Sequence, residues 1–541
     1  MTPMKHFFSG ALIIAILIQI PALQAQTAVR KDLPQRLAPL QKSQAQNSSG
    51  ATTITVVIPA SEAIILFPAD PTARTKEKIR ALLTDGKGTF MATLSSGGQS
   101  TLKTNTPNIR VRDLEPVLGP GEAKGKKSDL LLAGVPIVDK TIRFNPMTMD
   151  DGYVHTPLYI ELVNLLHLIP TSKMPLRAEY AKLVYRFTDA KDQWTRITNP
   201  MNGSNVDAIP AGLHLINFNP VKYLKSIESD NSEVIAVARS RYNVLNLVNK
   251  AKHLLGNSEN DSSPAVFSSS QVKTEKTKPF RVEIEWIKKF KTETEKSTPD
   301  QELENAKTLK DLLVKAYSAP LKFSGSALYR ELNSVMDLQQ LFRFMAVNRI
   351  LENGDISDEF LWYVEKNAKT GQCRLGIMPQ DGDDMFKGAH FFPTTPKQIG
   401  LIINSSGIAR KLGLEFGYIM NYEDPLFRMV QEDAGLFYAY LAAFEQLAKE
   451  LGETPALDNL LKGLSTKILP YANDPEVLTR GHADERKQDY SPTSFATGIN
   501  TLRRQITTNT GRVLTNLRGT RGKPGDLERA KKASQEIDSK K

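Results

Sequence analysis

The stretch that decides the fold runs from Asp337 to Phe386 and reads DLQQLFRFMAVNRILENGDISDEFLWYVEKNAKTGQCRLGIMPQDGDDMF. Its first part predicts a helix from Asp337 to Leu351, with apolar residues at helical spacing. Two apolar runs, Leu361–Glu365 and Cys373–Met378, flank a turn and predict a β-hairpin. One acidic loop precedes this hairpin and a second follows it, so carboxylates are expected at both of its ends in the chain.

The first acidic loop contains Asn353-Gly-Asp355. A carboxylate on a fixed loop can accept the proton of a substrate hydroxyl or orient an attacking group. The same three residues also suit an ordinary turn, because Asn, Gly and Asp favour turn backbones. Asp355 is therefore the candidate catalytic base, with a plain turn as the alternative.

The second acidic loop is Pro379-Gln-Asp-Gly-Asp-Asp-Met-Phe386. Three carboxylates so close together repel one another unless a cation or solvent relieves the repulsion. Oxygen ligands of this kind suit Mg²⁺, Mn²⁺ or Ca²⁺. Asp381 and Asp383 are therefore candidate metal ligands, and the alternative is an acidic, well-solvated turn.

A third candidate lies earlier, in Gly97-Gly-Gln-Ser-Thr101, between two strand-like segments. A glycine-rich turn followed by hydroxyls can bring backbone N–H groups against phosphates. The candidate nucleotide-binding residues are Gly98, Ser100, Thr101 and the nearby cation Lys103. A glycine pair is also a common hairpin turn, which is the competing interpretation.

The order of helix, acidic loop, hairpin and acidic loop matches the layout of a kinase active site. Here the sequence resembles the CotH kinase family, atypical kinase-like proteins first associated with bacterial spore coats. The resemblance rests on Gly98–Thr101, on Asp355 before Phe360-Leu-Trp-Tyr363, and on Pro379–Phe386. It implies a two-lobed kinase-like fold, ATP with Mg²⁺ or Mn²⁺ as cofactor, and protein Ser/Thr as acceptor.

The sequence departs from the family pattern at the nucleotide-facing positions. The arginine expected before the glycine is Gly97, and the expected lysine pair falls on about Thr106-Pro107. Kinases hold a second metal with an asparagine, whose position is taken here by Phe360, or by Glu359 with a one-residue gap. The carboxylates are kept while these partners change, so phosphoryl transfer is expected to be weak or absent.

Two other functions remain open. The first is a secreted kinase-like binding or surface-associated protein without catalysis. The second is a hydrolase of cell-surface polymer that pairs Asp355 with Asp381, which requires the two carboxyl groups to lie about 5 Å or about 6.5–9.5 Å apart.

The whole chain is expected to be an α+β protein, β-rich in its first half and mainly helical in its second. The predicted divisions are a signal peptide (1–25), a polar linker (26–53), an N-terminal lobe (54–220), a C-terminal lobe (221–518) with a Ser/Lys-rich insertion at about 256–300, and a basic tail (519–541). Strands are predicted at 54–58, 89–94, 109–114, 180–187 and 213–218. Further helices are predicted at 75–83, 158–168, 303–316, 425–451, 456–464 and 499–517.

The N-terminus has the features of an export signal. Lys5 precedes the apolar run Gly10–Ile18, and small residues at Ala22 and Ala25 predict cleavage after Ala25. This apolar run is shorter than the roughly 20 residues of a spanning helix. A secreted or periplasmic protein without a membrane span is therefore expected.

Most of the chain's net charge of +11 lies at its end. Eleven basic and four acidic residues fall between Arg503 and Lys541. Such a tail either contacts an anionic cell-surface component or is a frayed, solvated terminus. No aromatic residues interleave with these charges, so no nucleic-acid partner is expected.

Overall fold

The structure is a computed structural model of the chain. It describes residues 50–97, 108–118, 130–147, 153–169, 176–226, 232–241, 281–287, 299–353, 360–379, 382, 385–386, 407–414, 418, 425–472, 474, 477 and 492–539. The chain divides into two compact units. Unit 1 comprises Met1–Pro146 and Glu179–Asn217, and unit 2 comprises Met147–Ala178 and Phe218–Lys541.

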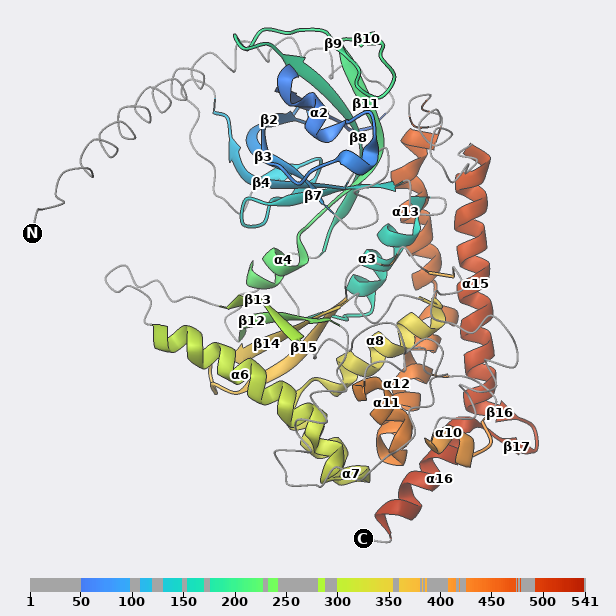
Figure 1. Ribbon diagram of the computed structural model, residues 1–541. Helices are drawn as coiled ribbons and strands as arrows, with labels where there is room; N and C mark the ends of the chain where they lie inside the picture. Colours follow the sequence, from blue (N-terminus) through green and yellow to red (C-terminus); the bar gives the residue numbers. More distant parts are fainter. Residues whose placement is uncertain are drawn as a thin grey trace, which may run out of the picture. The chain divides into compact units, whose positions relative to one another are not determined.

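Unit 1 is built on a closed seven-stranded β-barrel with the order β1-β2-β3-β4-β7-β11-β8 (Figure 1). Parallel pairing of β1 with β8 closes it, and the closure protects the strand edges. The barrel strands are β1 (Thr53–Pro59), β2 (Ile79–Thr84), β3 (Thr89–Gly97), β4 (Asn108–Pro116), β7 (Ile142–Pro146), β8 (Ala178–Thr188) and β11 (Ala208–Asn217). Short elements connect them: η1 (Ala60–Glu62), α2 (Ala63–Leu66), η2 (Pro71–Ala73), β5 (Leu131–Leu132), β6 (Val135–Pro136), β9 (Ile197–Thr198) and β10 (Asn205–Val206).

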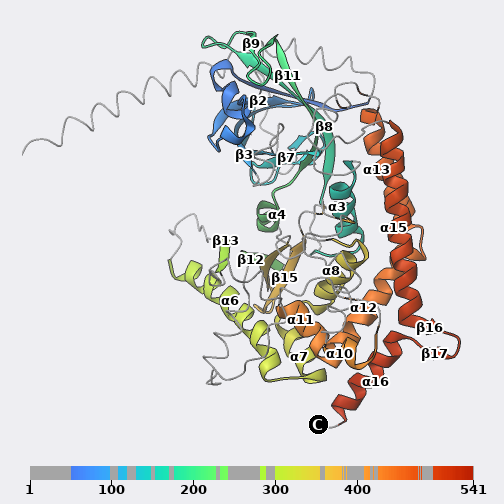
Figure 2. The same ribbon diagram turned by 45° about the vertical axis from the view of Figure 1, so that its right-hand side comes forward.

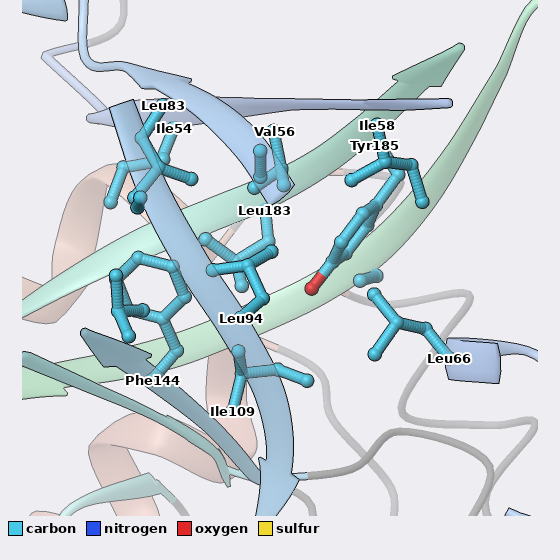
Figure 3. Packing of buried hydrophobic residues seen from close by; sticks show 14 of the residues in the cluster. Ile54, Val56, Ile58, Leu66, Leu83, Leu94, Ile109, Phe144, Leu183 and Tyr185 are labelled. Atoms are coloured by element: carbon cyan, nitrogen blue, oxygen red, sulfur yellow. The ribbon is translucent and has the colours of Figure 1, made fainter. Parts of the chain in front are cut away.

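Alternating side chains fill the barrel. Ile54, Val56 and Ile58 of β1 are completely buried among inward-facing residues of the other strands (Figure 3). Tyr185 meets Phe67 edge to face, with ring centroids 4.8 Å apart. The period-two apolar pattern of each strand thus becomes a continuous core.

The helix predicted over Thr75–Leu83 is wrong, because residues from Ile79 onward form strand β2. Ile79, Ala81 and Leu83 are buried, whereas Arg80 between them is exposed. This is the alternation of a strand, and β2 pairs with β1 and β3 on its two sides. Pairing within the barrel has overridden the local helical tendency of the lysine-rich segment before it.

Unit 2 combines helices with a four-stranded antiparallel sheet of order β13-β12-β14-β15 (Figures 1 and 2). The sheet strands are β12 (Ser232–Arg241), β13 (Arg281–Ile287), β14 (Phe360–Asn367) and β15 (Cys373–Pro379). The helices are α3 (His155–Leu165), α4 (Pro220–Ser226), α6 (Pro299–Ser318), η7 (Ala319–Leu321), α7 (Gly325–Val335), α8 (Leu338–Ile350), α10 (Gly407–Lys411), α11 (Pro425–Glu432), α12 (Ala434–Gly452), α13 (Ala456–Ala472), α15 (Pro492–Arg518) and α16 (Asp526–Asp538), with a small β16 (Gly519–Thr520) and β17 (Lys523–Pro524) ribbon.

The predicted hairpin is confirmed, but strands β12 and β13, which precede it in the chain and extend its sheet beyond β14, were missed. β14 and β15 pair from Phe360↔Pro379 to Lys366↔Cys373. The far edge of β15 is protected, because Leu375 O accepts from Asp337 N at 3.2 Å and Ile377 N donates to Gln340 Oε1 at 2.9 Å. The helix before the hairpin therefore covers its exposed edge.

The single helix predicted over Pro425–Leu451 is two helices, because Asp433 interrupts it. The Asp433 carboxylate caps α12 by accepting from Leu436 N at 3.0 Å, and it also accepts from Gly325 N at 2.6 Å. An N-cap residue takes a non-helical backbone, so the chain turns there. Helix α12 then packs against α8, α15 and α16.

The end of the chain is not the frayed terminus considered above. Residues Asp526–Asp538 form helix α16, whose Asp526 is 4% exposed and accepts a hydrogen bond from the Tyr418 hydroxyl. Arg529 pairs with this same carboxylate. Part of the terminal basic charge thus stabilises the fold itself.

At the coarser level the prediction is confirmed: the first half is β-rich and the second half is mainly helical. The segment 256–279, predicted to be a linker or insertion, lies outside the described residues. No helix among the residues that the structure describes is long and apolar enough to cross a membrane.

Candidate functional site

All the residues predicted to do chemistry lie outside the described part of the chain. They are Gly98, Ser100, Thr101, Lys103, Asp355, Asp381 and Asp383. The structure does describe the residues at which the corresponding loops begin and end, and these define the candidate site.

The described ends of the two acidic loops meet at one end of the β14–β15 hairpin. Phe360, which follows the first loop, pairs with Pro379, which precedes the second. Phe386, after the second loop, donates its N–H to Leu351 O at 3.1 Å, just before the first. The end of α8 and one end of the hairpin, between which the two loops run, therefore lie close together.

The C-terminus of α8 has every late carbonyl satisfied at this point. Asn353 N donates to Asn348 O at 3.0 Å and Glu352 N donates to Arg349 O at 3.4 Å, with Glu352 in the left-handed region at φ 48°. These two bonds are the pattern of a Schellman cap. Asn509, from α15, donates its side-chain amide to Ile350 O at 2.7 Å. The first acidic loop thus leaves from a fully hydrogen-bonded helix end.

A buried amide group links this helix end to α3. Asn348 and Asn353 are both completely buried. Asn348 Oδ1 accepts from Asn353 Nδ2 at 2.9 Å and from the Tyr159 hydroxyl at 3.1 Å, while Asn348 Nδ2 donates to Phe344 O at 2.8 Å. The side chain of Asn348 thereby fixes Asn353, two residues before Asp355.

Tyr159 also contacts the second acidic loop, at Gly382. A Cβ on Gly382 would lie 2.4 Å from Tyr159 Cγ, so only glycine fits between Asp381 and Asp383. The hydroxyl of Tyr159 binds the anchor of the first loop while its ring abuts the second. We call Tyr159, Asn348, Asn353 and Gly382 the Tyr159 network.

Phe360, the first described residue after the first acidic loop, lies in an aromatic cluster. It is 1% exposed and its ring centroid lies 5.7 Å from Phe344, 5.4 Å from Trp362 and 5.9 Å from Phe427. A buried phenyl ring offers no metal ligand. If Phe360 takes the position at which the family resemblance expects an asparagine, that position contributes packing; the alternative residue, Glu359, lies outside the described residues.

Charged side chains gather at the same end of α8. Glu352 lies 3.5 Å from Arg349 and 3.4 Å from Arg512. Burial lowers the pKa of the Arg349 guanidinium, and the Glu352 carboxylate opposes this shift. Two cations thus share one carboxylate at the negative end of the helix dipole, beside the first acidic loop.

In unit 1 the glycine-rich segment connects β3 to β4, which are paired at Gly97↔Asn108. A Cβ on Gly97 would lie 2.9 Å from Nε of Arg110, so this guanidinium lies over the glycine. Sequence reasoning named Lys103 as the nearby cation and missed Arg110, because the two strands bring it there by pairing. Among the described residues no group of three or more His, Cys, Asp or Glu side chains is placed to hold a metal.

Helix α8, the hairpin and the converging loop ends together define a mixed α/β protein in which the described ends of two acidic loops lie close together. The model of the family described as CotH kinase protein matches residues 247–507. This region therefore belongs to the CotH kinase family, and the resemblance predicted from the sequence is confirmed for it. Asp355, Asp381 and Asp383 fall inside the match, and Gly98–Lys103 fall before it. Comparison with curated proteins found no match.

Proposed function

We propose that the chain is an exported CotH-type phosphotransferase of weak activity. It would transfer the terminal phosphoryl group of ATP, with Mg²⁺ or Mn²⁺, to Ser or Thr of a protein. The observation that carries this proposal is the Tyr159 network, because one side chain supports the described ends of both acidic loops. Such positioning of charged groups accounts for most of the catalysis in phosphoryl transfer.

Asp355 is assigned the role of base. It follows Asn353 by two residues, so its Cα is within about 7 Å of that fixed point. From there its carboxylate would accept the proton of the acceptor hydroxyl as the oxygen attacks phosphorus. Arg349 and Arg512, which both pair with Glu352, add positive charge at this end of α8.

Asp381 and Asp383 are assigned the metal. They flank Gly382, whose backbone lies against the Tyr159 ring, and their carboxylate oxygens suit a hard divalent cation. When bound, the metal supplies charge neutralisation between the phosphates. Gly98, Ser100, Thr101 and Lys103, with Arg110 beside Gly97, are proposed to hold phosphate oxygens. The proposal also includes the two-lobed kinase-like fold that the family resemblance implies.

The second candidate is a secreted kinase-like binding protein without catalysis. Phe360 favours it, because this residue is buried in an aromatic cluster and supplies no ligand for a second metal. Loss of one well-placed electrostatic group commonly costs about 10²–10³ in rate. Transfer is therefore expected to be slow even where the base and the first metal are in place.

The deciding experiment incubates the purified chain with labelled ATP, Mn²⁺ and a generic Ser/Thr protein substrate. Slow labelling is expected, lowered by at least about 10² in Asp355→Ala. Asp311→Ala, an exposed carboxylate on α6, is the matched control and should label at the wild-type rate. Labelling that survives Asp355→Ala would refute the assigned base, and no labelling of any substrate would favour the binding protein.

Metal binding is tested separately by calorimetry with Mg²⁺ or Mn²⁺, with and without nucleotide. The wild-type chain should release or absorb binding heat that Asp381→Ala loses. Equal heats for the two proteins would count against the metal assignment.

Export is tested by N-terminal sequencing of the secreted or periplasmic material. The mature chain is expected to start at Gln26, after cleavage at Ala25. Recovery of the intact Met1 terminus in the cytosol would overturn this part of the proposal.

A further inference from the structure

A pocket of about 710 Å³ lies in unit 2 at the turn-proximal end of the β14–β15 hairpin. The end of α3, the start of α8 and the turn between α12 and α13 form its other walls. The described ends of the acidic loops lie at the opposite end of the hairpin, where Phe360 pairs with Pro379. The pocket volume is within the roughly 300–1,000 Å³ of sites that hold drug-sized ligands. The pocket therefore has room for a ligand that takes no part in the proposed phosphoryl transfer.

The floor of the pocket is a fixed polar layer around Tyr363. A Cβ on Gly376 would lie 2.0 Å from Tyr363 Cζ, so the glycine leaves the space that the phenol ring fills. Gln340 donates to the Tyr363 hydroxyl at 3.0 Å. Its side chain is held in turn by Leu168 O and Ile377 N, both at 2.9 Å. Burial raises the pKa of the Tyr363 hydroxyl well above its ordinary value, so the group keeps its proton. Because Gln340 Oε1 lies 3.5 Å away, too far for a strong hydrogen bond, this proton remains a donor for a ligand.

Opposite charges stand side by side on one wall of the pocket without pairing. Glu365 and Arg374 are directly opposite in the hairpin register, where Cβ atoms lie about 4.5–5.5 Å apart. Arg374 Nη2 instead donates to Asn333 O at 2.9 Å and Met336 O at 2.7 Å, at the C-terminal end of α7. The buried Nε of Arg374 has no acceptor in the described part of the chain. Neutral oxygens thus hold the guanidinium, and both charges remain in the lining.

This arrangement disfavours a ligand with a single charge. A cation that approaches Glu365 also approaches Arg374, and an anion that approaches Arg374 meets Glu365. The other guanidinium in the lining, that of Arg343, is paired with Glu450 through bonds of 3.1 and 2.6 Å. With histidine neutral, three carboxylates and two guanidiniums line the pocket, so neither sign of ligand charge gains a strong attraction.

Uncharged hydrogen-bonding groups complete the lining. Gln339 and Gln446 are exposed there, and a glutamine amide both donates and accepts hydrogen bonds. Leu165, which is 38% exposed, adds apolar surface. Donors and acceptors are therefore interleaved around a space with one apolar side.

The backbone beside the pocket is closed to a peptide strand. Leu375 O accepts from Asp337 N at 3.2 Å, and Ile377 N donates to Gln340 Oε1 at 2.9 Å. A peptide that adds to a sheet as a strand needs these edge groups of β15 to be open. The side chains of the lining, rather than its backbone, are left to recognise a ligand.

We propose that this pocket binds a neutral oligosaccharide, with its hydroxyl groups on Glu365 and Arg374 and a sugar ring against Leu165. One hydroxyl donates to the carboxylate while a neighbouring one accepts from the guanidinium, so both charges are used by an uncharged ligand. Every hydroxyl both donates and accepts, which matches the interleaved groups of the lining. The proposal goes beyond phosphoryl transfer and adds a glycan-recognition site to unit 2.

The test is calorimetric titration of the purified chain without nucleotide. The neutral probes are maltotriose, cellotriose, mannotriose and chitotriose, the trimer of N-acetylglucosamine. The charged probes are the glucosamine trimer, which has ammonium groups in place of the acetamides, and trigalacturonate. At least one neutral trisaccharide should bind with a Kd of about 1 mM or tighter. Both charged trimers should bind at least about tenfold more weakly, because each meets a like charge in the lining.

Two lining variants and two matched controls locate the site. Glu365→Ala should weaken the bound trisaccharide at least about tenfold, as expected for the loss of a hydrogen bond to a charged group. Gln339→Ala should weaken it about two- to tenfold, as expected for the loss of a neutral hydrogen bond. Glu536→Ala and Gln535→Ala, both exposed on α16, should leave the affinity unchanged.

The absence of binding by every neutral trisaccharide would overturn the proposal, and so would unchanged affinity in Glu365→Ala. Binding of either charged trimer as tightly as the neutral ones would show that charge, rather than hydroxyl recognition, selects the ligand. Tighter binding of the zwitterionic peptide Ala-Ala-Ala would likewise refute an oligosaccharide. Because no nucleotide is present, each of these results leaves the proposed phosphoryl transfer to its own test.

Discussion

Asn348 is expected to be the most sensitive polar residue of unit 2. Its Oδ1 accepts from Asn353 Nδ2 and from the Tyr159 hydroxyl, all three side chains being buried. Asn348→Ala removes the acceptor of two buried donors, and each such loss costs about 1–3 kcal/mol. The variant should therefore lose about 2–6 kcal/mol of its free energy of unfolding, a large part of the roughly 5–15 kcal/mol of a typical domain.

The measurement is urea unfolding followed by tryptophan fluorescence. The chain has three tryptophans. In a Trp194→Phe background the signal comes from Trp286 and Trp362, which both belong to unit 2. With a slope of about 1–3 kcal/mol per molar urea, the midpoint should fall by about 0.7 M or more without a change of slope.

Tyr159→Phe is the matched variant. It removes one hydroxyl and leaves Asn348 Oδ1 bound to Asn353, so it should cost about 1 kcal/mol. If Asn348→Ala costs no more than Tyr159→Phe, the reasoning that Asn348 joins the two loop anchors is refuted.

Three further changes test other parts of the fold. Gly382→Ala should destabilise unit 2 by at least about 1–3 kcal/mol in thermal unfolding, because its Cβ would lie 2.4 Å from a ring carbon of Tyr159. Gly463→Ala, in open space on α13, should stabilise unit 2 by about 0.5–1 kcal/mol. Equal melting temperatures for the two variants would contradict this expectation. Asp526→Asn weakens the bond from the Tyr418 hydroxyl and should speed hydrogen exchange in α16, and unchanged exchange would show that the bond does not hold the helix. Burial raises the pKa of the Cys373 thiol, which reduces its thiolate fraction. The alkylation rate of Cys373 at pH 8 should therefore be lower than that of glutathione, and it should still increase above pH 9. A rate equal to that of glutathione would contradict the shift.

Elements with strong local patterns could be predicted from the sequence. The β14–β15 hairpin has an apolar run on each side of Asn367-Ala-Lys-Thr-Gly371, and Gly371 takes the positive φ of 70° that its turn requires. The helix Leu338–Ile350 has Asp337 as its cap, and its carboxylate accepts from Gln340 N at 3.0 Å. Here the determinants lie within a few residues of one another.

The errors have the opposite origin. β2 is a strand because β1 and β3 lie on its two sides, which its own residues do not reveal. Asp433 breaks the long helix partly by binding Gly325 N, which is 108 positions away. In both places a distant partner, rather than local propensity, decided the backbone.

The candidate site divides in the same way. Clustered carboxylates are visible in the sequence because their repulsion makes them unusual side by side. The residues that anchor their loops are not, since Tyr159 reaches Asn348 across 189 positions and Asn509 reaches Ile350 across 159. The motif also did not predict the packing role of Phe360, because only the fold shows that this residue is buried in an aromatic cluster.

The extent of the functional unit follows from this network rather than from the family match. The match begins at residue 247, whereas unit 2 includes Met147–Ala178. That earlier segment contributes Tyr159, whose hydroxyl binds Asn348 and whose ring abuts Gly382. It also contributes Glu161, which pairs with Lys467 of α13 at 3.0 Å. A chain cut at residue 247 would keep all the acidic residues of the two loops and lose the side chain that contacts Asn348 and Gly382, so the matched region needs α3 to hold the described ends of these loops.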